Sequence, residues 1–291
     1  MDNNLKAPII LIGNYRSGTS ITQNLIGLHP DIAAWYEPRT MWLYADPGRG
    51  HDEFDESDAT HPVTLYIRQR FLAYQMRHGN RRVMEKTPGN VLRVPYVRAI
   101  FPEATFLHMT RNPFSVISSM ESKWQRTKTL RGIRRSISDT PTTQLPYYLR
   151  QFLQDMVRKK ILRRKYVSIY GPRYKGIEED LRTMSRMRVV ARQWAIGNRK
   201  ARQDLAELEP GRVLSFRYEQ LMAAPRETFR GIYDHCRLAF TPDMLDKAEQ
   251  MVDPGRQDKW HRLEPAQLKA VLPEIEDEMR HCGYDLPLAL Q

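Results

Sequence analysis

The sequence predicts an α/β fold: a three-layer parallel sheet with a P-loop-like segment near its start and a helical, basic insertion in its middle. Two observations carry this prediction. Short apolar runs alternate with longer helical patterns near both ends of the 291-residue chain, as in parallel sheets with right-handed helical crossovers. A glycine-containing loop follows the first apolar run directly and precedes a helical pattern, which is the context that phosphate loops require.

Four short apolar segments are predicted to form strands, over residues 7–14, 81–87, 104–111 and 212–221. Helices are predicted between and after them, over residues 20–29, 63–79, 91–101, 113–124, 225–236, 241–252 and 264–282. Pro30 and Gly79 end the first two of these helices. Pro113 suits the first turn of the helix that follows the third strand.

The middle of the chain, residues 121–210, shows no strand pattern and is predicted to be a helical insertion. Long helices are expected over residues 145–166 and 177–208, with a polar loop over 126–143. The length suits one large domain or two small ones. We expect a single domain over residues 1–291 that includes the insertion.

Positive charge is concentrated in this insertion. Residues 123–175 carry 15 Lys or Arg against two acids, Asp139 and Asp155, which accounts for the whole formal net charge of +12. Such an excess favours an anionic partner, which could be nucleic acid, an anionic membrane surface or an acidic polymer. A solvated helical face is an equally good interpretation.

Cysteine usage and the N-terminus predict a cytoplasmic protein. Cys236 and Cys282 form no C-x-x-C pair, so zinc and redox motifs are not indicated and two free thiols are expected. The first residues lack the pattern of a signal peptide. No apolar stretch approaches the roughly 20 residues of a membrane helix.

Residues 13–20, GNYRSGTS, nearly match the nucleotide-binding motif G-x-x-x-x-G-K-[ST]. Thr19 stands where the lysine belongs, and Arg16 supplies a cation three residues earlier. Gly18 permits the tight path that directs the unpaired amides of a helix N-terminus at one anion. Thr19 and Ser20 add hydroxyl donors, and Arg16 adds a charged fork suited to phosphate or sulfate oxygens. An ordinary glycine turn is the simpler alternative.

An NTPase would need a lysine after Gly18 and an acidic residue at a nearby strand end to help hold magnesium. Both are missing, because the strand predicted over 104–111 ends in Arg111. No metal site is predicted, so we expect protein cations to neutralise the ligand of the loop.

These residues resemble the sulfotransferases that use 3′-phosphoadenosine 5′-phosphosulfate (PAPS). The 5′-phosphosulfate loop of that family often reads R-S-G-T-[TS], as residues 16–20 do, which implies that Ser17 and its loop neighbours bind the co-substrate. The family binds the 3′-phosphate with an Arg at a strand end and a Ser eight residues later. Arg111 and Ser119 match that pair. The two signatures in this order are specific together, although each is weak alone.

Further segments match the family over roughly residues 8–125 and 190–285, but not over most of the basic middle. The YEPRT segment implies Glu37 as the catalytic base, as in tyrosyl-protein and many carbohydrate sulfotransferases. MEKTPGN implies that Lys86 faces the sulfuryl group, and FRYEQL implies that Tyr218 reaches the nucleotide.

The C-terminal region resembles a basic loop over the nucleotide, where Arg256 and Lys259 could touch phosphates. This loop lacks the R-K-G triplet of the cytosolic branch, and Arg16 replaces that branch's loop lysine. The histidine base of the cytosolic branch also has no counterpart. His108 lies within a predicted strand, and His29 is interpreted as a packing or capping residue.

The resemblance implies in-line transfer of a sulfuryl group from PAPS to an acceptor hydroxyl, which leaves adenosine 3′,5′-bisphosphate (PAP). Glu37 would take the hydroxyl proton, while Arg16, Lys86 and the loop amides stabilise the developing charge. Arg111 and Ser119 would hold the 3′-phosphate. The expected acceptor is a hydroxylated compound, neutral or anionic, such as a glycan, a glycolipid or another metabolite.

Each assignment has a simpler structural alternative. Glu37 could pair at the surface with Arg39, Lys86 could pair with Glu85, and Arg111 could cap the sheet edge. Tyr218 could be a core aromatic, and the C-terminal cations Arg256 and Lys259 could be solvated.

Two other function classes compete with sulfuryl transfer. One is a P-loop kinase or other NTPase, which the missing loop lysine disfavours. The other is a nucleic-acid or acidic-polymer module, for which the cations lack interleaved aromatic residues. We therefore expect no specific nucleic-acid partner and allow membrane-surface contact through residues 123–175. The sequence does not indicate the acceptor or the oligomeric state.

Overall fold

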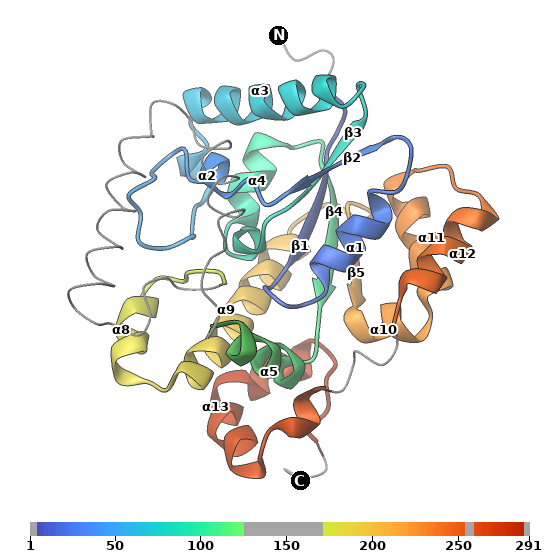
Figure 1. Ribbon diagram of the computed structural model, residues 1–291. Helices are drawn as coiled ribbons and strands as arrows, with labels where there is room; N and C mark the ends of the chain where they lie inside the picture. The colour runs from blue at the N-terminus through green and yellow to red at the C-terminus, as the bar shows by residue number, and fades with distance from the viewer. Residues whose placement is uncertain (1–4, 125–170, 254–258, 288–291) are drawn as a thin grey trace.

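The computed structural model describes residues 5–124, 171–253 and 259–287 (Figure 1). Five parallel strands form one sheet in the order β2-β3-β1-β4-β5. Their bounds are β1 Ile9–Gly13, β2 Ile32–Tyr36, β3 Arg82–Lys86, β4 Thr105–Thr110 and β5 Val213–Arg217. The parallel α/β sheet predicted from the sequence is confirmed.

Helices cover both faces of the sheet and complete three layers (Figure 1). On one face lie α1 (Thr19–Ile26), α10 (Tyr218–Ala223), α11 (Pro225–Cys236) and α12 (Pro242–Met251). On the other lie α2 (Arg39–Trp42), α3 (His61–Arg77), α4 (Val94–Ile100), α8 (Ile177–Thr183) and α9 (Arg186–Ala206), with the 3-10 helices η1 (Glu56–Asp58) and η2 (Pro88–Leu92). A further apolar cluster joins α9 to α5 (Pro113–Trp124) and α13 (Pro265–His281), beside η5 (Lys259–Arg262).

Alternate residues of β1 serve the two apolar layers. Ile10 and Ile12 pack with the α3 and α4 side, whereas Ile9 and Leu11 pack with the α1 and α11 side. All four are completely buried. A strand that is buried on both faces reads as a continuous apolar run, which is why the sequence predicts it well.

The prediction missed β2. Its sequence IAAWY holds two alanines and is only five residues long, so its propensity signal is weak. Pairing with β3 over its full length stabilises it instead. This strand matters for the site because Glu37 follows it directly.

The strand predicted over residues 212–221 is too long. It ends at Arg217 because its partner β4 ends at Thr110, the residue opposite Arg217. Beyond that point α10 begins at Tyr218, and the Gln220 side chain accepts a hydrogen bond from the Arg217 amide at 2.8 Å. Tyr218 is therefore the first residue of a helix rather than part of a strand.

The helical character of the insertion is confirmed where the structure describes it. The helix predicted over 177–208 is divided into α8 and α9 by Met184 and Ser185, and Ser185 caps α9. The helix predicted over 145–166 and the loop over 126–143 lie outside the described residues. Across residues 5–124, 171–253 and 259–287, no helix combines the length and the apolar character that crossing a bilayer requires.

Candidate active site

The predicted site residues gather at one edge of the sheet. Lys86 is the last residue of β3, and Glu37, Arg111 and Tyr218 directly follow β2, β4 and β5. Arg16 lies three residues after β1. Parallel strands end at the same edge, and ligands of open α/β sheets bind there, where the strand order reverses. In this sheet the order reverses between β1 and β4.

The loop between β1 and α1 adopts a left-handed backbone at two residues, Arg16 with φ of 68° and Gly18 with φ of 93°. Such a φ is uncommon for arginine and is typical of strained functional loops. Gly18 is the N-cap of α1, and no side chain caps this helix. The amides at the start of α1 can therefore serve a ligand.

Gly18 packs directly on Tyr218. A Cβ atom at Gly18 would lie 2.3 Å from Tyr218 Cδ2, which no real contact allows. The guanidinium carbon of Arg111 lies 4.0 Å from the centroid of the same ring. Tyr218 is buried, and its ring packs against both Gly18 of the loop and Arg111.

Arg16 joins the loop to the predicted 3′-phosphate pair. Its Nε donates to Ser119 Oγ at 2.8 Å, and its carbonyl oxygen accepts from Arg111 Nη1 at 3.2 Å. The structure thus brings Arg16, Arg111 and Ser119 together, with Arg16 between the other two. The sequence predicted that Arg111 and Ser119 converge but did not predict that Arg16 bridges them.

The turn after β4 is fixed by neighbouring helices. Trp194 Nε1 of α9 donates to the Arg111 carbonyl at 2.9 Å, and Glu219 of α10 accepts from the Asn112 amide at 3.0 Å. Glu219 also accepts from the Tyr284 hydroxyl at 2.9 Å. Burial lowers the pKa of Arg111, although the nearby Tyr218 and Glu219 oppose this effect.

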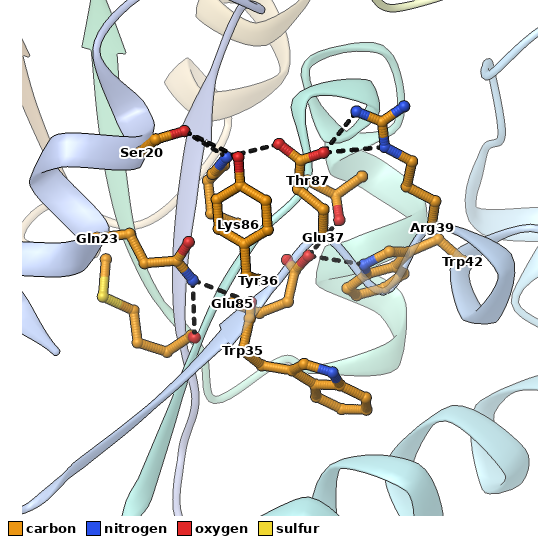
Figure 2. Close-up of polar contacts among 11 residues, drawn as sticks. Ser20, Gln23, Trp35, Tyr36, Glu37, Arg39, Trp42, Glu85, Lys86 and Thr87 are labelled. Atoms are coloured by element: carbon orange, nitrogen blue, oxygen red, sulfur yellow. Dashed lines mark hydrogen bonds and ion pairs between the residues drawn. The ribbon is translucent and has the colours of Figure 1, made fainter. Parts of the chain in front are cut away.

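Lys86 reaches across to the start of α1 and to Glu37, as Figure 2 shows. Its Nζ lies 2.7 Å from Glu37 Oε1 and 3.1 Å from Ser20 Oγ. The ammonium also lies 4.1 Å from the ring centroid of Tyr36, whose hydroxyl is 3.2 Å from Ser20 Oγ. Lys86 is 1% exposed, so its charge depends on these partners.

Glu37 is held by a second cation. Arg39 donates to Glu37 Oε2 from Nη2 at 2.5 Å and from Nε at 3.0 Å (Figure 2). Burial raises the pKa of the Glu37 carboxyl, but Arg39 and Lys86 together outweigh burial and hold the pKa below its usual value. Glu37 also has a positive φ, 50°. The Arg39 contact named in the simpler alternative for Glu37 exists, yet the Glu37 side chain is only 11% exposed and is not a surface carboxylate.

The suggested pairing of Lys86 with Glu85 is wrong. Successive residues of a strand point to opposite faces, and Glu85 lies on the α2 side, where Trp42 Nε1 donates to it at 3.0 Å. Sequence reasoning did not find the part that Tyr36 plays beside Lys86. The missed strand β2 would have revealed it, because Tyr36 is the register partner of Lys86.

The C-terminal cations are not placed. Arg256 lies outside the described residues, and for Lys259 only its position at the start of η5 is described. The two histidines fit the sequence interpretation. His108 is buried within β4, and His29 lies 2.6 Å by its Nε2 from the Ala239 carbonyl oxygen.

Two curated relatives align with less than half of the chain. Nodulation protein NoeE of Sinorhizobium fredii (strain NBRC 101917 / NGR234) is 29% identical over 136 residues, covering 39% of this chain and 31% of the relative. Protein-tyrosine sulfotransferase 1 of Danio rerio is 29% identical over 131 residues, covering 41% and 37%. The chain thus spans about a third of the length of these relatives.

Solved structures with the same fold cover nearly the whole chain. The sulfotransferase domain of the Synechococcus PCC 7002 olefin synthase has a TM-score of 0.60 at 16% identity and covers 98% of this chain and 97% of its own. Mouse sulfotransferase SULT7A1 complexed with PAP has a TM-score of 0.51 at 12% identity, covering 96% and 87%.

A match to a family model shows to which protein family the chain belongs. The model described as the sulfotransferase family matches residues 8–170 and 155–242, which is most of the chain. This match includes the loop at Arg16, the Glu37–Lys86 pair and the Arg111–Ser119 segment. The chain belongs to the sulfotransferase family.

Proposed function

We propose that this protein transfers a sulfuryl group from PAPS to an acceptor hydroxyl and releases PAP. The observation that carries the proposal is the contact of Glu37 with Lys86, 2.7 Å apart, beside the phosphate loop. A carboxylate next to a cation at an anion-binding loop provides a base and a charge stabiliser within reach of one transferred group.

The residues fit the anionic groups of PAPS. Three cations, Arg16, Lys86 and Arg111, lie at the sheet edge with the uncapped start of α1. Ser17 Oγ is fully buried and has no hydrogen-bond partner among the described residues, although buried hydroxyls normally have one. A phosphosulfate at this loop would supply acceptor oxygens to these donors.

Glu37 is suited to remove the acceptor proton. Its low pKa keeps it ionised at neutral pH. As the acceptor oxygen bonds to sulfur, its proton passes to Glu37, and the bond from sulfur to the bridging oxygen of PAPS breaks. The electron pair of that bond stays on the phosphate of PAP.

Lys86 and Arg16 are suited to stabilise that leaving phosphate. Lys86 contacts Ser20 of α1 and Glu37 at the same time, so it lies between the loop and the base. Arg16 and Arg111 carry further positive charge toward Ser119. Catalysis of phosphoryl transfer depends mainly on positioning the reactants and stabilising the developing negative charge, and sulfuryl transfer requires the same two effects.

For the acceptor we propose a carbohydrate or glycolipid hydroxyl. The family segments around Glu37 and Lys86 resemble relatives that act on carbohydrates, which supports this choice. The protein-tyrosine sulfotransferase relatives make a phenolic hydroxyl the comparison substrate. We also propose that the positively charged residues 123–175 contact an anionic surface. Most of that segment lies outside the described residues, so this part of the proposal rests on its charge alone.

The experiment is transfer of radiolabelled sulfate from PAPS to a panel of oligosaccharides, glycolipids and tyrosine peptides, by the wild type and by Glu37→Gln. We expect label in a sugar acceptor with the wild type and a loss of at least about 100-fold in Glu37→Gln. PAP affinity should stay within a few-fold of the wild type. Label transfer only to tyrosine would overturn the carbohydrate assignment, and full activity of Glu37→Gln would overturn the base.

A further inference from the structure

We propose that Glu85, a buried residue that does not face the reacting groups, is a positioning residue that holds the Glu37–Arg39 segment against Lys86. This inference rests on the proposed function, because it assigns Glu85 a role in the same reaction. It begins from a group that the reaction does not use, a carboxyl completely buried in β3.

Glu85 accepts three hydrogen bonds from three parts of the chain. Trp42 Nε1 and Thr87 Oγ1 donate to its Oε1 at 3.0 and 2.5 Å, and Asn90 Nδ2 donates to its Oε2 at 2.9 Å. Figure 2 shows the first two of these contacts. Burying a carboxylate is costly unless such partners replace water. The three hydrogen bonds therefore fix the positions of the Trp42, Thr87 and Asn90 side chains relative to β3.

The network connects directly to the catalytic pair. Trp42 ends α2, and Arg39, the partner of Glu37, begins the same four-residue helix. Lys86 is the next residue after Glu85. The bond from Trp42 to Glu85 therefore ties the helix that begins with Arg39 to the strand that carries Lys86.

Only a group that accepts at both oxygens fits this position. Trp42 and Arg93 can only donate. Arg93 Nε donates to Asn90 Oδ1 at 2.9 Å, which turns the Asn90 amide nitrogen toward Glu85. A glutamine at this position would put an N–H group opposite the Asn90 N–H group. Replacing one oxygen by nitrogen thus breaks the network without changing its volume.

The same geometry makes Glu85 sensitive to protonation. Burial raises its pKa to about 7, and the Thr87 and Trp42 hydrogen bonds and the charges of Arg93 and Lys86 oppose the rise. Arg93 and Lys86 are the charged groups that act on it, and Asp52 lies near Arg93. Protonation would add an O–H donor, and the Thr87 hydroxyl would have to turn from donor to acceptor to receive it, so the alignment of α2 should change as pH falls through about 7.

The first test compares Glu85→Gln with the double variant Glu85→Gln/Asn90→Asp. In the double variant, the carboxylate at position 90 can accept from both Arg93 and the amide at position 85, which restores the donor–acceptor order. We expect kcat to fall about 10- to 100-fold in the single variant, since displacements of about 1 Å have effects of this size. The double variant should recover most of that loss, and PAP affinity should stay within about twofold in both.

A second variant covers the case in which Glu85→Gln fails to fold. Trp42→Phe removes the tie between α2 and β3 and leaves the carboxylate in place, so kcat should again fall about tenfold. Phe229→Leu is the control, because Phe229 is also a completely buried aromatic residue but packs in the apolar layer on the other face of the sheet. We expect Phe229→Leu to keep kcat within about threefold of the wild type.

A spectroscopic readout separates this inference from the proposed function. In a protein labelled with ¹⁵N, the Trp42 indole N–H resonance should titrate near pH 7 in the wild type and in Glu37→Gln, but not in Glu85→Gln. The amide resonances of Glu37 and Arg39 should shift in Glu85→Gln, while those of residues 16–20 stay in place. These signals do not require turnover, so they decide the positioning role even if no acceptor is sulfated.

Three results would overturn the proposal. One is a kcat of Glu85→Gln within twofold of the wild type. Another is a loss of PAP affinity as large as the loss of kcat, which would indicate general unfolding rather than positioning. The third is that the amide resonances of Glu37 and Arg39 stay unchanged in Glu85→Gln.

Discussion

Glu37 Oε1 lies 2.7 Å from Lys86 Nζ, and the same two residues are joined by a backbone hydrogen bond of 3.1 Å from the Glu37 amide to the Lys86 carbonyl. The pairing of β2 with β3 therefore extends one residue past the end of β2. The sheet register itself brings the proposed base to the proposed cation, and a rigid element positions catalytic groups more accurately than a loop does.

Removing the lysine tests whether this contact is catalytic. We expect Lys86→Met to lower kcat by about 100- to 1000-fold, the range seen when a preorganised charge stabiliser is removed. Lys269→Met on α13 is the control and should retain activity. The measurement is single-turnover transfer from PAPS at saturating concentration, and a loss smaller than tenfold would contradict the assigned role.

Arg39 sets the basicity of Glu37. Burial raises the pKa of Glu37, but Arg39 and Lys86 lower it by more. In the folded protein the carboxyl therefore stays ionised at pH values below its ordinary pKa. Arg39→Ala should let that pKa rise, so the acid limb of kcat that Glu37 controls should move to higher pH. A kcat profile from pH 4 to 9 measures this. Arg182→Ala, which breaks an exposed pair with Glu179, should leave the limb unmoved; a limb that also stays fixed in Arg39→Ala would refute the effect.

Gly18 should be required for PAP binding. Gly18→Ala adds a methyl group 2.3 Å from Tyr218 Cδ2 at a residue with φ of 93°, so the loop must move. We expect PAP affinity to fall at least about tenfold. Gly211→Ala separates the effect of the clash with Tyr218 from the effect of a positive φ, because Gly211 has φ of 83° but open space around it. Gly211→Ala should lose about 1 kcal/mol of folding stability and keep its PAP affinity. Isothermal titration calorimetry measures the PAP affinity of both variants.

His108 should make the fold sensitive to acid. Burial, together with the charge of Arg202, lowers its pKa to about 4, so the folded state resists protonation. Between about pH 6.5 and 4 the unfolded chain binds the extra proton, and stability falls as pH falls through this window. Relative to His108→Gln, the wild type should lose roughly 2–3 kcal/mol of unfolding free energy between pH 7 and 4. Urea unfolding of both proteins at the two pH values tests this, and a constant difference would contradict it.

The sequence predicted which charged residues meet at one edge of the sheet more completely than it predicted the strands that carry them. Arg16 and Arg111 stand out because each follows an apolar run, whereas Lys86 was named only through the resemblance of MEKTPGN to the family. The catalytic and binding roles of all three stay predictions. The strand β2 was missed because its stability comes from pairing with β3, which propensity does not report. The end of β5 was missed for the same reason, since it depends on where β4 ends.

Side-chain geometry was beyond the sequence. The bridge from Arg16 to Ser119 and the left-handed backbone of Arg16 and Glu37 depend on contacts between distant segments. Glu85 was interpreted only as a partner for Lys86, because its network with Trp42 and Asn90 appears only when α2, β3 and η2 come together. The single domain over residues 1–291, the cytoplasmic location and the contacts of Arg256 and Lys259 stay predictions.

Stabilisation by PAP compared with ATP and magnesium tests the central claim most directly. We expect PAP at about 100 times its dissociation constant to raise the unfolding free energy by roughly 2.7 kcal/mol and ATP with magnesium to have little effect. The PAP effect should be strongly reduced in Arg111→Ala. Selective stabilisation by ATP with magnesium, or an undiminished PAP effect in Arg111→Ala, would contradict a PAPS site at Arg16, Arg111 and Ser119.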